Sequence, residues 1–388
     1  MTAGTLVGVG GTAAAPGTAV ATRSLRGPLH DRHRALGAVF ADHGGWLMPE
    51  SYGDPVGEHL DVRAAAGLFD LSHLGGIQVT GPEAALALDY ALLGDMARMP
   101  AGAARYTLML DPAGGIIDDM VIYAPSPTEI LVVPTAARAS VVADELVART
   151  AEFQVEVADV AAASFQLAVQ GPRSREILEE AGAWRERGAE PAAERTCRFT
   201  VVGGCPVLIG SMSYTGEEGF EIIGRVGDAG AVWSALLAVG VAHGLRPAGL
   251  LARSTLRIEA VRPRVGAEMD RTTTPYDVGL RHLVPHAKEE QYVGREGLVA
   301  ALQDGTSRTV AGLLGDGRVA PAPGAPVTMP DDGRPVGVIT SSCLGPSAGA
   351  PVALALMDAA AAREGGWVLA SGVPMRVTEP PLHLRDGI

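Results

Sequence analysis

Residues 106–123 read YTLMLDPAGGIIDDMVIY, and this stretch has the clearest pattern in the chain. Two apolar runs flank a Pro-Ala-Gly-Gly turn, which predicts a β-hairpin. Asp118 and Asp119 open the second run, and adjacent residues of a strand point to opposite faces. One carboxylate therefore faces inward, where a charge is costly unless it is paired or used in chemistry. The alternative is that the aspartate pair only caps the turn, and this stretch alone leaves both open.

The segments around this hairpin predict a mixture of strands and helices. An antiparallel sheet backed by helices, an α+β unit, accounts for their order. The expected strands cover 76–80, 104–110, 116–123 and 129–134, and the expected helices cover 30–40, 57–66, 82–93 and 136–150.

A second unit of the same kind follows in tandem, without a detectable sequence repeat. Its expected strands cover 165–169, 198–203, 206–211 and 219–223, and its expected helices cover 172–181 and 229–244. From about residue 305 the chain becomes rich in Gly, Pro and short apolar strands, which is typical of a small β-barrel. We therefore expect a flexible tail over 1–25, a region of two α+β domains over 26–300 and a C-terminal β-barrel domain over 301–388.

Composition excludes several classes of function. The formal net charge is −13, which disfavours binding to nucleic acid or to an anionic membrane surface. Lys288 is the only lysine, in a charged setting that indicates a solvated side chain, so Schiff-base enzymes and Walker-type phosphate loops are disfavoured. No apolar run reaches the ~20 residues that a membrane helix needs. Residues 1–25 make a poor signal peptide, and we expect a cytoplasmic protein.

We expect neither a metal site nor a disulfide framework. Cys197, Cys205 and Cys343 have the spacing of neither, so free thiols are expected. His282 and His286 are four residues apart, but no carboxylate motif accompanies them.

A series of short motifs, in order along residues 28–358, resembles the aminomethyltransferase family, the T-proteins of the glycine cleavage system. None of the motifs is specific alone, and the resemblance rests on their order. The motifs are GWLMP at 45–49, YGD at 52–54, GLFDLSH at 67–73, the aspartate pair, AVQGP at 168–172, SYTGEEGFE at 213–221, ARSTLRIEA at 252–260, EMD at 268–270, TTPYDVGL at 273–280 and YVGREGL at 292–298.

The resemblance implies a cloverleaf of three domains around a central folate channel. Two of these are α+β domains interwoven in sequence, and the third is the β-barrel. Tetrahydrofolate, or 5,10-methylenetetrahydrofolate, would occupy the channel with its pterin end deepest.

The resemblance also assigns roles to individual residues. Glu221, a lone carboxylate in an apolar strand, would accept hydrogen bonds from the pterin edge, and the alternative is an edge-strand side chain facing water. Asp119 would be the catalytic carboxylate, which holds the attacking amine, stabilises developing positive charge and relays a proton. Asp118 would then be structural.

Three further residues are expected at the folate site, each with an ordinary structural alternative. Tyr106 would line it, unless it is only a cross-strand aromatic. Tyr214, in the SYTG turn, would line the folate site in a similar way. Arg253 would hold a carboxylate of folate or substrate, unless it only forms an ion pair with Glu259. We expect His73 to be structural or to line the site.

The chain departs from the family pattern at several positions. Pro134 replaces a usual Asn, and LARS at 251–254 and RHLV at 281–284 differ from the relatives. The leading function is a tetrahydrofolate-dependent one-carbon transferase of the aminomethyltransferase type, with a small-molecule one-carbon donor or a lipoyl carrier protein as partner. One alternative is a specialised folate-dependent methyl or methylene transferase, or a demethylase. Another is a non-catalytic folate-binding protein of the same fold.

Overall fold

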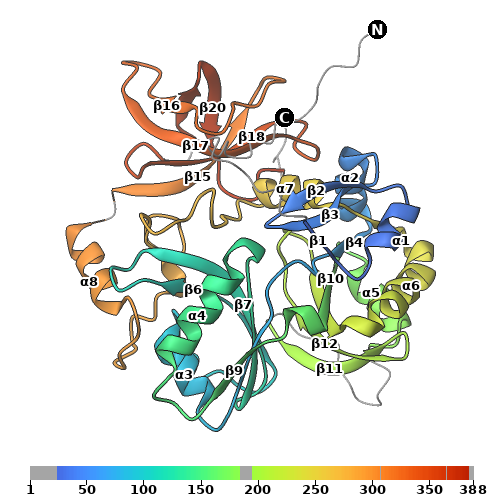
Figure 1. The fold of residues 1–388 in the computed structure, drawn as a ribbon. Coiled ribbons are helices and arrows are strands. Elements are labelled where there is room, and N and C mark those ends of the chain that lie inside the picture. Colours follow the sequence, from blue (N-terminus) through green and yellow to red (C-terminus); the bar gives the residue numbers. More distant parts are fainter. Residues whose placement is uncertain (1–23, 184–194, 306, 364, 384–388) are drawn as a thin grey trace.

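Two α+β lobes and a β-barrel make up the computed structural model, which describes residues 24–183, 195–305, 307–363 and 365–383 (Figure 1). Of the expected tail, 1–25, residues 1–23 lie outside the described residues. Leu25 is part of a small three-stranded sheet, in which it pairs with Trp46. That sheet contains β1 (Leu25–Arg26), β2 (Val39–His43) and β3 (Trp46–Ser51).

The first lobe is a five-stranded sheet in the order β6-β7-β8-β5-β9. The predicted hairpin is its β6–β7 pair, in which Leu108 lies opposite Asp119. Helices α3 and α4 cover one face and supply Leu88, Val142 and Leu146 to its core. The elements are β5 (Ile77–Thr80), α3 (Ala84–Ala91), β6 (Ala103–Leu110), β7 (Ile116–Ser126), β8 (Glu129–Pro134), α4 (Ala139–Arg149) and β9 (Glu156–Asp159).

The second lobe is a six-stranded sheet in the order β11-β12-β13-β10-β4-β14, packed against α5 and α6. Strand β4 precedes the first lobe in sequence, so the two lobes are interwoven and the simple tandem order predicted from the residues is wrong. The elements are β4 (Ala66–Asp70), β10 (Ser164–Gln170), α5 (Ser174–Glu180), β11 (Cys197–Val202), β12 (Cys205–Ser211), β13 (Gly219–Arg225), α6 (Ala229–Gly240) and β14 (Leu245–Pro247).

Six strands close the C-terminal barrel in the order β15-β18-β17-β16-β19-β20. The predicted α+β class with a C-terminal barrel is thus confirmed. The strands are β15 (Arg308–Gly315), β16 (Pro326–Thr328), β17 (Pro335–Gly345), β18 (Ala350–Asp358), β19 (Trp367–Ala370) and β20 (Val373–Val377). Helix α8 (Arg295–Asp304) precedes them.

Two predicted helices have different bounds. Helix α1 (His30–Ala35) ends before Gly37, whose φ of +78° breaks the helix. Val39 and Phe40, predicted as helical, instead begin β2 and pair with β3. Helix α2 (Pro55–Ala64) starts earlier than predicted because Asp54 accepts a hydrogen bond from the Gly57 amide at 2.9 Å and caps it.

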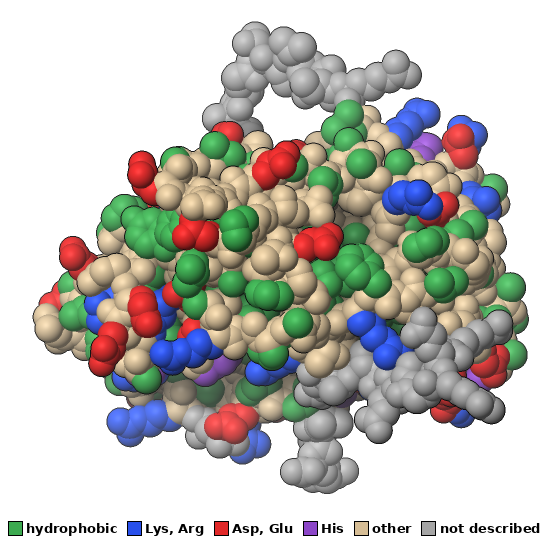
Figure 2. Space-filling view, turned by 90° about the horizontal axis from the view of Figure 1, so that it is seen from below, with side chains coloured by type: hydrophobic (Ala, Val, Ile, Leu, Met, Phe, Trp, Pro, Cys, Tyr) green, Lys and Arg blue, Asp and Glu red, His purple; other side chains and the backbone are tan. Residues whose placement is uncertain are grey.

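The surface view in Figure 2 shows acidic and arginine side chains interspersed with apolar and neutral ones. Among the described residues, Val226–His243 is the one helical segment long and apolar enough to cross a membrane, by length and composition alone. Its Val232, Trp233 and Leu236 pack into the core of the second lobe.

Lys288 is buried, contrary to the prediction that it is solvated. Its Nζ lies 2.8 Å from Asp89 Oδ2 and donates to the carbonyl oxygens of Asp89 and Gly94 at 2.7 and 2.9 Å. The sequence did not indicate this partner because Asp89 lies 199 positions earlier in the chain. The ammonium group joins α3 and the loop after it to the connection that leads to α8.

Asp118 is a second buried charged residue with a structural role. It is fully buried and accepts hydrogen bonds from the amide of Thr135 at 2.9 Å and from its hydroxyl at 2.7 Å. Burial, with the adjacent Asp119 charge, raises the pKa of Asp118 to about 7, against the Thr135 hydrogen bonds that lower it. Asp118 thus holds the end of β8 against β7.

We expect Lys288→Met to lower the free energy of unfolding by about 3–5 kcal/mol, because it leaves the Asp89 carboxylate buried without its counter-charge. Chemical denaturation measures the loss. Glu289→Gln, at an exposed neighbouring position, is the matched control and should change stability by less than about 0.5 kcal/mol. Equal effects of the two substitutions would contradict the buried ion pair.

The raised pKa of Asp118 predicts how stability varies with pH. The folded state favours the protonated carboxyl, so this contribution is complete below the unfolded pKa near 4 and is lost as the pH rises towards about 7. Relative to Asp118→Asn, the parent should lose about 1–3 kcal/mol of unfolding free energy between pH 5 and pH 7.5. Parallel urea titrations at the two pH values test this, and identical pH dependence of the two proteins would refute it.

Candidate active site

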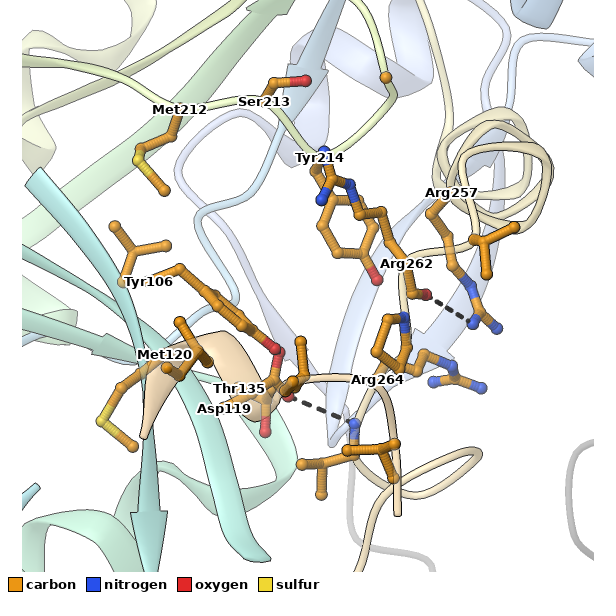
Figure 3. Close-up of a pocket in the computed structure, with 18 of the residues that line it drawn as sticks. Tyr106, Asp119, Met120, Thr135, Met212, Ser213, Tyr214, Arg257, Arg262 and Arg264 are labelled. Carbon is orange, nitrogen blue, oxygen red and sulfur yellow. Dashed lines mark hydrogen bonds between the residues drawn. The ribbon is translucent and has the colours of Figure 1, made fainter. Parts of the chain in front are cut away.

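One large cavity, with a volume of about 1530 Å³, lies where the two lobes, the segment after helix α7 (Leu250–Glu259) and the barrel meet. Both lobes, α7 with the loop after it, and barrel strands contribute to its lining. In Figure 3, Tyr106, Asp119 and Met120 lie on one side, and Arg257, Arg262 and Arg264 lie on the other. The cavity therefore has the Asp119 carboxylate on its first-lobe side and an arginine-rich wall from α7 and its following loop.

Alternation along β7 separates the two aspartates, as the sequence predicted. Asp119 lines the cavity, whereas Asp118 points into the protein towards Thr135. Asp119 is 7% exposed, accepts a hydrogen bond from the Tyr106 hydroxyl at 3.1 Å, and receives the Val265 amide at 3.3 Å. Burial raises its pKa, partly opposed by the Val265 and Tyr106 hydrogen bonds and by the charge of Arg253. Its carboxylate is thus held in place at the cavity wall, and no residue in the described part of the chain forms an ion pair with it.

Glu221 reaches the same cavity from the second lobe. It lies on β13, is 7% exposed, and accepts a hydrogen bond from the Tyr123 hydroxyl on β7. Burial raises the pKa of Glu221, while that hydrogen bond and the Arg253 charge lower it. The prediction that this carboxylate lies in an apolar setting, rather than facing water, agrees with its burial.

The Tyr123–Glu221 contact depends on a glycine. Gly210 lies opposite Glu221 in the sheet, and a Cβ placed there would come 2.0 Å from the Tyr123 ring. Any side chain at 210 would therefore displace Tyr123 from the position in which it bridges the two lobes.

Arg253 and Tyr214 are brought together by packing between α7 and the SYTG turn. The guanidinium carbon of Arg253 lies 3.8 Å from the Tyr214 ring centroid, a cation–π contact. Arg253 makes no ion pair with Glu259, whose carboxylate instead lies 3.1 Å from Arg63 and 3.2 Å from His59. The alternative that Arg253 serves as an ion-pair partner of Glu259 is therefore wrong.

All five predicted site residues line this one cavity: Tyr106, Asp119, Tyr214, Glu221 and Arg253. Sequence reasoning missed Tyr123, the Val265 amide, and the pair of His43 and Glu50, whereas His73, expected to be structural or to line the site, does line the cavity. Tyr123 closes the stretch quoted first, but its partner is 98 residues away, so no local pattern indicates it.

Within the ranges that the structure describes, no group of three or more His, Cys, Asp or Glu side chains could hold a metal ion. His282 lies in a short 3-10 turn, Arg281–Leu283, and His286 lies beyond it, so the two do not share an α-helix face. All three cysteines are free thiols.

Comparison with known proteins identifies the family. The GCVT N-terminal domain matches residues 29–288, and the glycine cleavage T-protein C-terminal barrel domain matches residues 308–383. The aminomethyltransferase of Saccharopolyspora erythraea is 40% identical over 363 residues, covering 92% of this chain and 98% of that protein. The aminomethyltransferase of Streptomyces avermitilis is 42% identical over 355 residues, covering 91% and 94%.

A solved structure agrees with these relatives. The glycine cleavage system aminomethyltransferase T from Bartonella henselae superposes with a TM-score of 0.83 at 33% identity, covering 92% of this chain and 97% of that one. The chain therefore belongs to the aminomethyltransferase family, the T-proteins of the glycine cleavage system, and is a one-carbon transferase of that type.

Proposed function

We propose that the cavity binds tetrahydrofolate and that the one-carbon transfer takes place against Asp119. The observation that carries this proposal is that two buried carboxylates, from different lobes, face one cavity. A pterin presents an aminopyrimidine edge rich in hydrogen-bond donors, which matches a buried carboxylate with free acceptor positions. Glu221 is such a group, because only the Tyr123 hydroxyl donates to it among the described residues.

The remaining residues would orient the ligand. Arg253, stacked on Tyr214, offers a planar set of donors for a carbonyl or a carboxylate. Tyr106 already donates to Asp119 and lines the cavity beside it. Tetrahydrofolate supplies the two nitrogens that accept the one-carbon unit, and the chain supplies their position.

Asp119 would act through its charge and its capacity to hold a proton. The carboxylate would hold the attacking nitrogen, stabilise positive charge that develops on the transferred group, and accept a proton. A raised pKa suits this role because it brings the carboxyl nearer to exchanging a proton at neutral pH.

We further propose that the one-carbon donor is an aminomethyl group on a lipoyl carrier protein and that the enzyme acts in the cytoplasm. Family membership supports the carrier. Release of ammonia and formation of methylenetetrahydrofolate from an aminomethylated carrier is the assay. Folate binding without such turnover would instead favour a specialised transferase or a demethylase with a small-molecule donor.

For binding, we expect Glu221→Gln to lower the affinity for tetrahydrofolate by about tenfold or more. The substitution replaces a charged acceptor by an amide, and a hydrogen bond to a charged group contributes roughly 1.5–3 kcal/mol. Titration calorimetry of the parent and the folded variant measures the change. Equal affinities would remove Glu221 from the folate site.

For catalysis, we expect Asp119→Asn to leave folate binding nearly intact and to lower turnover by about 10²–10⁴-fold, the range for loss of an acid–base or electrostatic group. Asp118→Asn is the matched neighbour and should affect stability more than rate, because it faces Thr135. The two variants are compared at saturating folate. The assignment would be refuted if the Asp118→Asn variant were inactive and the Asp119→Asn variant active, or if both variants had full activity.

A further inference from the structure

A second polar group lines the same cavity, on the wall formed by residues 43–74. Its members are His43 at the end of β2, Glu50 on β3 and His73 after β4. His43 Nε2 and Glu50 Oε2 are 2.7 Å apart, and the rings of His43 and His73 have centroids 6.1 Å apart. None of these side chains has a role in the proposal above.

Backbone contacts place this group beside the aspartate pair. Gly44, next to His43, packs against Ala136, because a Cβ built at Gly44 would lie 3.1 Å from the Ala136 side chain. On the other side, the Gly75 amide donates to the carbonyl oxygen of Pro134 at 3.1 Å. The segment between these contacts contains Thr135, which binds Asp118. His43 and His73 therefore lie beside Thr135, and all three line the same cavity as Asp119.

The group is arranged to meet a ligand rather than to complete the fold. His73 Nδ1 is buried and has no hydrogen-bond partner among the described residues. Burial lowers the pKa of His73 to about 3, with the Asp70 charge opposing and the Arg253 charge adding to the effect, so the ring is neutral. Because Nδ1 is buried, a hydrogen bond from this neutral ring to a molecule in the cavity has to come from its other nitrogen, Nε2.

His43 differs from His73 because it has a carboxylate partner and remains partly exposed to the cavity. Its side chain is 31% exposed, and that of Glu50 is 26% exposed. The titratable groups facing His43 are Glu50 from β3, His73 from the segment after β4, and Asp42 on its own strand, which is itself held by Ser24 and the Gly45 amide. A histidine with one nitrogen fixed by a carboxylate and the other free is the usual arrangement of an acid–base group.

The reaction needs more than one such group. Transfer of an aminomethyl unit breaks one C–S and one C–N bond of the donor and forms two C–N bonds to folate. Two folate N–H protons are lost, and the sulfur and the departing amine gain one proton each, so the atoms balance without an oxidant or a reductant. The Asp119 carboxylate can carry the proton that one folate nitrogen loses and the sulfur gains. The proton that the departing amine gains needs a second acid–base group.

We propose that His43, oriented by Glu50, is the second acid–base group of this transfer, and that His73 hydrogen-bonds the amino group of the donor. This inference rests on the proposed function. Asp119 accepts the proton of the attacking nitrogen and returns it to the sulfur. His43 gives a proton to the amine as its C–N bond breaks, and regains one when the second folate nitrogen loses its own.

The test is a single-turnover assay of ammonia and methylenetetrahydrofolate formation from an aminomethylated lipoyl carrier, with titration calorimetry of folate in parallel. We expect His43→Ala to keep folate affinity and to lose about 10²-fold or more in rate. Added imidazole should restore part of this loss, which a merely structural histidine would not allow. Glu50→Gln should lose less, and His286→Ala, at an exposed position outside the cavity lining, should match the parent with or without imidazole.

The outcomes separate the two proposals. Parent-like turnover of His43→Ala, or a loss that imidazole does not restore, would overturn the role of His43 while the proposed function stands. If the parent binds folate but releases no ammonia from the carrier, the carrier-dependent function fails, and the role of His43 fails with it.

Discussion

The hydrogen bond from the Tyr123 hydroxyl to the Glu221 carboxylate joins the two lobes at the wall of the cavity. It joins β7 of one sheet to β13 of the other, and Gly210 leaves the space that the Tyr123 ring occupies. Because both groups are buried, leaving either without its partner would cost the full desolvation penalty. The contact therefore helps to hold the two lobes together, with the backbone hydrogen bonds of Cys197 to Gly102 and of Ala104 to Arg195, and it also holds the carboxylate at the cavity wall.

A comparison of the buried carboxylates separates structural groups from those available to a ligand. Burial alone would raise the pKa of Glu259, but hydrogen bonds from His59, the Ala348 amide and Arg63 hold it at about 2. Asp119 and Glu221 are also buried, each 7% exposed against 0% for Glu259, but each has a raised pKa and accepts fewer hydrogen bonds. Their remaining acceptor positions face the cavity. A ligand that brings donors or positive charge would offset the cost of burying these carboxylates. New hydrogen bonds to them would therefore contribute to its binding free energy.

Features set by local chemistry were predictable from the sequence, and features set by long-range contacts were not. The hairpin of residues 106–123 and the opposite orientations of Asp118 and Asp119 follow from strand alternation and a glycine turn. The motif series placed Glu221 and Arg253 at the cavity. Lys288 was misjudged because its charged neighbours dominate the local pattern, whereas Asp89 and the Gly94 carbonyl approach it from far away in sequence. The His43–Glu50 pair was missed because neither residue stands out in its own segment, and only the β2–β3 hairpin brings them together.

Helix α7 connects the arginine-rich wall to the barrel. On one side of the helix, Arg257 pairs with Glu268 at 2.8 Å and donates to Ser341 of β17 at 2.7 Å. Near its end, Glu259 accepts the Ser347 amide of the β17–β18 turn at 2.9 Å. The barrel thus holds α7 through the charged side chains of Arg257 and Glu259. Arg253, one turn earlier on the same helix, has no ion-pair partner among the described residues and stacks on Tyr214. Its position is therefore determined by the barrel on one side and the second lobe on the other, while its donors stay available. The barrel therefore takes part in positioning Arg253 through α7, and its strands β15 and β20 also line the cavity.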